Sequence, residues 1–114
     1  MNARQNEARN ASNGRVAYRI LPLSCELPVP SVPSGVTFTK EERAMYRSIF
    51  KGPHGNFLDE SNAYEVATYV LLSHQLFRGE ASAWVAAERG KLATQLGMTP
   101  VSLKALGYVL EGSQ

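Results

Sequence analysis

The sequence predicts a small all-α domain of four helices that follows a proline-rich arm. Four residues that favour helix N-caps, Thr39, Asp59, Ser82 and Thr99, each precede a stretch with apolar side chains at helical spacing. Glycine or proline separates these stretches, and four of the six prolines precede residue 39. A chain of 114 residues is also too short for more than one ordinary domain.

Residues 1–38 are predicted to be a basic, flexible arm, because their prolines fix an extended backbone and remove hydrogen-bond donors. The short apolar stretch 16–23 is expected to stay mobile unless a partner or a neighbouring subunit orders it. The first twenty residues carry four arginines against one glutamate, whereas the rest of the chain carries eight basic against nine acidic residues. Such an arm suits a polyanion, and a solvated tail is the alternative. The candidate DNA contacts of the arm are Arg4, Arg9, Arg15 and Arg19.

The first helix is predicted to run from Thr39 to about Phe50 and to begin with a capping box, in which Thr39 and Glu42 satisfy two main-chain donors. Basic residues recur along one of its sides at helical spacing, as a surface that binds phosphates would require. The alternative is an ordinary solvated surface, partly neutralised by Glu41 and Glu42. The candidate DNA contacts on this helix are Lys40, Arg43, Arg47 and Lys51.

The second helix, expected over about 60–77, is apolar nearly all round. Such a helix must be covered on several sides, and the remaining chain offers few elements to cover it, so the pattern predicts self-association. The alternative is a central helix that the other helices of a single subunit enclose. The candidate interface residues are Tyr64, Val66, Tyr69, Val70, Leu72, Leu76, Phe77 and Trp84.

We expect a third helix over about 83–96, a stop at Gly97 and a fourth helix that continues to about Leu110. This spacing is typical of a helix-turn-helix, and a purely structural helical hairpin is the alternative. Two polar residues of the fourth helix, Ser102 and Lys104, are its candidate DNA contacts, and Tyr108 is expected on the same exposed side. We therefore predict that residues 39–110 form one helical domain for oligomerisation and DNA binding.

Nothing in the sequence predicts an enzyme, a metal site or a cofactor. His54 and His74 lack a cysteine, serine or carboxylate partner at the spacing of a catalytic or metal motif. The single cysteine, Cys25, fits a reducing compartment. No apolar run approaches the roughly 20 residues that span a bilayer, so we expect no membrane partner and a cytoplasmic location.

Three segments resemble the small terminase subunits of tailed bacteriophages: the capped helix start over 38–46, Leu58-Asp59-Glu60, and the run from Leu96 to Leu103. The resemblance covers about residues 28–107 and is sharpest in the last segment. It implies a ring-shaped homo-oligomer in the host cytoplasm that recognises double-stranded viral DNA at the start of genome packaging. It also implies a partner, the large terminase subunit, which carries the ATPase and nuclease. A small helix-turn-helix transcriptional regulator and a phage structural or assembly adaptor are the alternatives.

Overall fold

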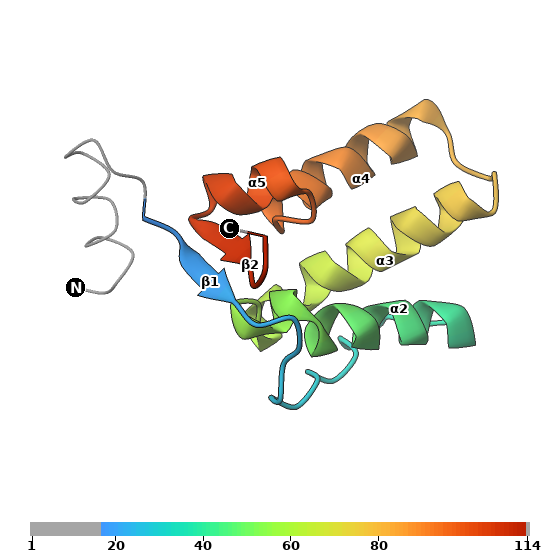
Figure 1. Ribbon diagram of the computed structural model, residues 1–114. Helices are drawn as coiled ribbons and strands as arrows, with labels where there is room; N and C mark the ends of the chain where they lie inside the picture. Colours follow the sequence, from blue (N-terminus) through green and yellow to red (C-terminus); the bar gives the residue numbers. More distant parts are fainter. Residues whose placement is uncertain (1–16, 114) are drawn as a thin grey trace.

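The computed structural model describes residues 17–113, and the chain is mostly helical there, as the sequence predicts (Figure 1). In chain order the elements are strand β1 (Arg19–Leu21), helix α2 (Lys40–Lys51), the 3-10 helices η1 (Pro53–Asn56) and η2 (Glu60–Asn62), and the helices α3 (Ala63–Phe77), α4 (Ala83–Gln95) and α5 (Pro100–Ala105), followed by strand β2 (Tyr108–Leu110).

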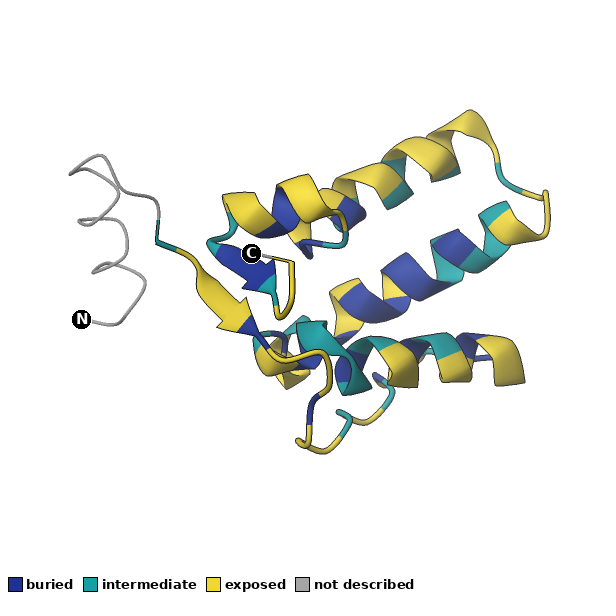
Figure 2. Ribbon diagram, in the orientation of Figure 1, coloured by how far each residue is buried: buried dark blue, intermediate teal, exposed yellow. Residues whose placement is uncertain are grey.

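Helix α3 is the central element and contacts both α2 and α4. Its Val66 and Val70 are fully buried, and they pack with Tyr46 and Phe50 of α2 and with Leu96. In Figure 2 buried residues recur along most of α3, whereas α4 is exposed over most of its length. The core therefore lies on both sides of α3, inside a single subunit.

The predicted helix starts at Thr39, Ser82 and Thr99 are confirmed. The Thr39 hydroxyl accepts a hydrogen bond from the main-chain N–H of Glu42, and the Glu42 carboxylate accepts one from the N–H of Thr39 at 2.8 Å. The Ser82 and Thr99 hydroxyls accept from the third residue of their helices in the same way. An N-cap of this type stabilises a helix by about 1 kcal/mol, which helps to place the short helix α5.

For residues 17–38 the structure corrects the prediction of a flexible arm. The segment is extended, as its prolines require, but it packs on the helices and buries Leu21, Cys25 and Phe38. The main-chain N–H of Cys25 also donates to the carbonyl of Lys51 at 2.9 Å. The prolines keep the segment extended, and its partly buried valines pack against the same core.

The fourth helix ends at Ala105, and its predicted continuation to about Leu110 is wrong. Gly107 has a φ of 96°, and the chain then forms β2, which pairs in parallel with β1 so that Arg19 lies opposite Tyr108. Glycine reaches this backbone conformation without a side-chain penalty, and the residues after it favour strands. The helical pattern of the sequence does not reveal the pairing, because the partner strand lies near the other end of the chain.

Candidate nucleic-acid interface

Three of the basic residues predicted on α2 form one exposed surface, which we call the α2 basic face: Lys40, Arg43 and Arg47. At about 100° per residue they fall within a third of the helix circumference. None of them forms an ion pair with another residue of the 17–113 segment. Their charges are therefore available to a ligand.

The fourth predicted residue, Lys51, has a structural role. Its side chain is half-buried, and its ammonium group donates a hydrogen bond to the main-chain carbonyl of Leu27 at 2.9 Å. This bond fastens the extended segment to the C-terminal end of α2. Lys51 adds positive charge near the α2 basic face, but its ammonium group is already hydrogen-bonded and is therefore less available to contact a phosphate.

Glu42 does not neutralise the α2 basic face, because its side chain is buried between α2 and α3. Its carboxylate accepts a hydrogen bond from His74 Nδ1 at 2.8 Å, in addition to the one from Thr39. Burial alone would raise the pKa of Glu42, but the hydrogen bonds from Thr39 and His74 outweigh it, so this pKa lies below its ordinary value of 4.5. Of the two acidic residues that the solvated-surface interpretation invoked, only Glu41 remains exposed.

The side of α2 that carries Glu42 is held rigidly. Tyr46 is buried between two other aromatic rings, with centroids 5.4 Å from Phe38 and 5.0 Å from Phe50. Its hydroxyl donates to the main-chain carbonyl of Ser31 at 3.2 Å. These contacts fix the rotation of α2 about its axis, and this rotation determines where the α2 basic face points.

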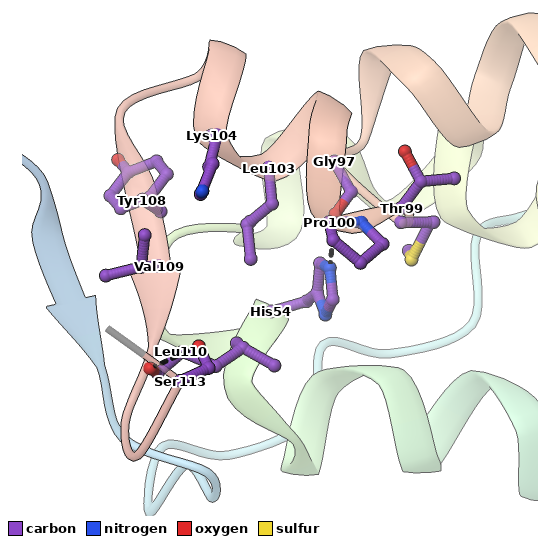
Figure 3. Close-up of a pocket in the computed structure, with 11 residues that line it drawn as sticks. His54, Gly97, Thr99, Pro100, Leu103, Lys104, Tyr108, Val109, Leu110 and Ser113 are labelled. Carbon is purple, nitrogen blue, oxygen red and sulfur yellow. Dashed lines mark hydrogen bonds between the residues drawn. The ribbon is translucent and has the colours of Figure 1, made fainter.

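The α4–α5 hairpin is held by a tight turn at Gly97, whose φ is 72°. His54 Nε2 donates to the main-chain carbonyl of Gly97 at 2.8 Å and so joins this turn to η1 (Figure 3). A methyl group on Gly97 would approach the side chain of Leu106 to 2.9 Å. The Leu106 side chain could move aside, so the turn requires glycine mainly for its backbone angle.

The hairpin provides less for DNA than the sequence predicts. Ser102 is a wrong prediction, because it is buried and its hydroxyl completes the capping box with Thr99. Tyr108 is also buried, and its ring stacks on Phe57 with centroids 4.6 Å apart. Only Lys104 of the predicted contacts is exposed, while Val101 beside it is 80% exposed. An exposed valine and one lysine cannot read several base edges.

A pocket of about 250 Å³ lies beneath this hairpin, between α5, β2 and His54 (Figure 3). Its walls are mainly apolar and include Leu103 and Val109, and Lys104 lies at one side. One ring nitrogen of His54, Nε2, donates to the main-chain carbonyl of Gly97. Within residues 17–113 no group of three histidine, cysteine, aspartate or glutamate side chains could hold a metal ion.

The predicted oligomer interface separates into two sets. Val66, Tyr69 and Val70 are buried inside the subunit, so their assignment to a surface between subunits is wrong for this conformation. The reason is that α2 and α4 already cover α3 from two sides, as in the alternative of a central helix. Tyr64, Phe77 and Trp84 are 60%, 70% and 67% exposed. Leu72 and Leu76 are half-buried.

One functional candidate was not found from the sequence. Arg89 of α4 extends over α3, where its Nε donates to the Ser73 hydroxyl at 3.0 Å and one terminal nitrogen donates to the Tyr69 hydroxyl at 2.9 Å. Its guanidinium carbon also lies 4.9 Å from the centre of the Tyr69 ring. A single arginine in a mixed helix gives no local signal of such a position.

The remaining predicted contacts lie near the start of the chain. Arg19 is exposed on β1, and Arg4, Arg9 and Arg15 lie outside the described residues. Among the helices that the structure describes, none has both the length and the apolar composition to cross a membrane. No protein-family model, curated protein or solved structure matches this chain.

Proposed function

We propose that this protein binds double-stranded DNA and assembles with copies of itself, and that its particular role is that of a phage small terminase subunit. The observation that carries the DNA-binding part is the α2 basic face, an exposed cluster of three cations without carboxylate partners in residues 17–113. From Lys40 to Arg47 the helix rises by about 10 Å, and duplex DNA presents roughly six phosphates over that length.

The assembly part rests on two exposed aromatic side chains, Phe77 of α3 and Trp84 of α4, whose apolar surface a contact between subunits would remove from water. Assembly would also strengthen DNA binding. About three phosphate contacts per subunit give weak binding, but linked copies raise the effective concentration of each further contact and increase the overall affinity by roughly 10² or more.

The packaging role is supported by the resemblance of Leu96–Leu103 to small terminase subunits. In that role the ring would bring viral DNA to the large subunit in the host cytoplasm and would itself need no cofactor. A neighbouring reading frame that encodes a large packaging ATPase would support the role independently of any binding assay.

Two measurements test the proposal. Light scattering gives the mass of the particle in solution, and the proposal requires more than two subunits, whereas a transcriptional regulator of this size would be a dimer. Titration of labelled duplex DNA at rising salt then separates DNA binding from protein binding, because contacts to phosphates weaken as salt rises. A monomer at high concentration, or affinity that salt does not change, would contradict the proposal.

The second candidate function is a phage assembly adaptor that contacts only protein. It is favoured by the hairpin, where Val101 is exposed at the start of α5 and Ser102 is buried. An adaptor would assemble with other proteins but would show no binding in the same DNA titration.

A further inference from the structure

An apolar groove runs between α2 and α4 over the central helix α3. It is lined by Met45 and Ile49 of α2, Phe77 of α3, Arg89 of α4, and Met98 after α4. Its volume is about 470 Å³, so it could receive large side chains from another helix. Helices α2 and α4 both pack on α3, which leaves a place above α3 for the fourth helix of a bundle.

Arg89 gives this groove a charge that the subunit does not balance. Its two hydrogen bonds, to Ser73 and Tyr69, hold the guanidinium in place but leave three of its five N–H donors for another group. No carboxylate of the described segment forms an ion pair with it. A surface that fits the groove should therefore be apolar and should carry one carboxylate.

The other side of α4 has this composition. Trp84 precedes the buried Ala93 by nine residues, which places it on the opposite side of the helix, where it is 67% exposed. Glu88 lies one turn after Trp84 on the same side. It is held only by a surface ion pair with Lys91 at 3.0 Å, and such pairs are worth little. We call this side, with Trp84 and Glu88, the outer face of α4.

We propose that the outer face of α4 of one copy packs into the groove of a second copy, with Trp84 between the groove walls and Glu88 paired with Arg89. The proposal rests on the self-association in the proposed function and names the surfaces that mediate it. The two surfaces lie on opposite sides of one helix, so each copy uses one surface towards each neighbour. Such a heterologous contact builds rings or filaments rather than closed dimers.

The heterologous arrangement makes a mixing experiment decisive. Trp84→Ser removes the inserted side chain but keeps the groove, and Arg89→Glu spoils the groove but keeps the outer face of α4. In sedimentation equilibrium of the full chain, each variant alone should associate at least about 30-fold more weakly than the wild type, as expected for a central interface residue. Their equimolar mixture should form a 1:1 dimer and nothing larger, because only one intact contact can form.

Leu23→Ser is the matched control, since Leu23 is an exposed apolar residue outside both surfaces. It should assemble like the wild type. If circular dichroism shows that Arg89→Glu is unfolded, Met45→Lys in the groove wall replaces it in the mixture.

The outcomes separate the two proposals. A monomeric wild type overturns this interface and the self-association in the proposed function together. A wild-type oligomer that survives both Trp84→Ser and Arg89→Glu overturns this interface alone, as does a mixture of the two variants that stays monomeric. The DNA affinity of a single subunit, measured separately on a duplex that spans only one subunit, tests the DNA-binding part of the proposed function whichever of these results is found.

Discussion

Neutralising two arginines of the α2 basic face should weaken DNA binding without disturbing the fold. We expect this of the double variant Arg43→Gln/Arg47→Gln. Both side chains are exposed and form no ion pair with another residue of the described segment, so their replacement should change the free energy of unfolding by less than about 0.5 kcal/mol. The loss should therefore fall on the phosphate contacts alone.

The size of the effect follows from counterion release. With three cations on phosphates, the slope of log K against log salt is about −2.7 per subunit, and with only Lys40 left it is about −0.9. Between 50 and 200 mM salt the affinity of the wild type should fall about 40-fold and that of the variant about 4-fold. If the two lines converge at 1 M salt, the variant binds roughly 60-fold more weakly at 100 mM.

The assay is fluorescence anisotropy with a labelled duplex of about ten base pairs. Such a duplex is about 34 Å long, which matches one subunit with its extents of 47 × 32 × 26 Å, and it limits the contribution of neighbouring copies. The control is Arg78→Gln/Lys91→Gln, which removes the same charge from two cations that lie outside α2 and already form ion pairs. This control should keep the salt slope of the wild type.

An unchanged salt slope in Arg43→Gln/Arg47→Gln would remove α2 from the DNA site. An equal loss in the control would show that net charge, and not this surface, determines the affinity. Either result would refute the reasoning from the exposed and unpaired position of these arginines.

Three further predictions concern the fold that positions these surfaces. The pKa of Glu42 lies below 4.5 in the folded chain, so protonation of this carboxylate favours the unfolded chain. Chemical denaturation should show the free energy of unfolding falling as the pH drops below 4.5, and falling less steeply in Glu42→Gln. Gly55→Ala forces a methyl group against the main-chain oxygen of Phe50 and should lower the free energy of unfolding by about 3 kcal/mol or more. Gly90→Ala has open space around it and should stabilise α4 by about 0.5–1 kcal/mol, so thermal melts that rank the two variants equally would contradict this reasoning. Tyr108→Ala removes a buried, stacked ring and should lower the free energy of unfolding by about 3 kcal/mol in urea titrations, and a loss under 1 kcal/mol would show that β2 contributes little.

The helical part of the fold could be predicted because its signals are local. Thr39, Ser82 and Thr99 each act within one turn of their own helix, and Gly97 ends α4 through its own backbone angle. The pairing of β1 with β2 could not be predicted in this way, because each strand has three residues and its partner lies near the opposite end of the chain. The burial of the 17–38 segment depends in the same way on distant helices.

The candidate site shows the same division. Helical spacing predicted the α2 basic face, since residues three and four positions apart must lie on one side of a helix. Spacing could not show that Ser102 turns inward to complete a capping box, because a serine at the third position of a helix can equally face solvent. It also could not show Arg89 over the Tyr69 ring, since that contact depends on how α4 crosses α3.

The two proposed activities are coupled through α2. Its basic face and its groove wall adjoin along the helix, with Ala44 between Arg47 on one side and Met45 on the other. The buried hydrogen bond between Glu42 and His74 fixes α2 against α3, so both surfaces keep one orientation. A second copy bound in the groove would therefore hold its basic face at a fixed orientation relative to the basic face of the first copy. Successive copies would then present their cations to DNA at regular intervals.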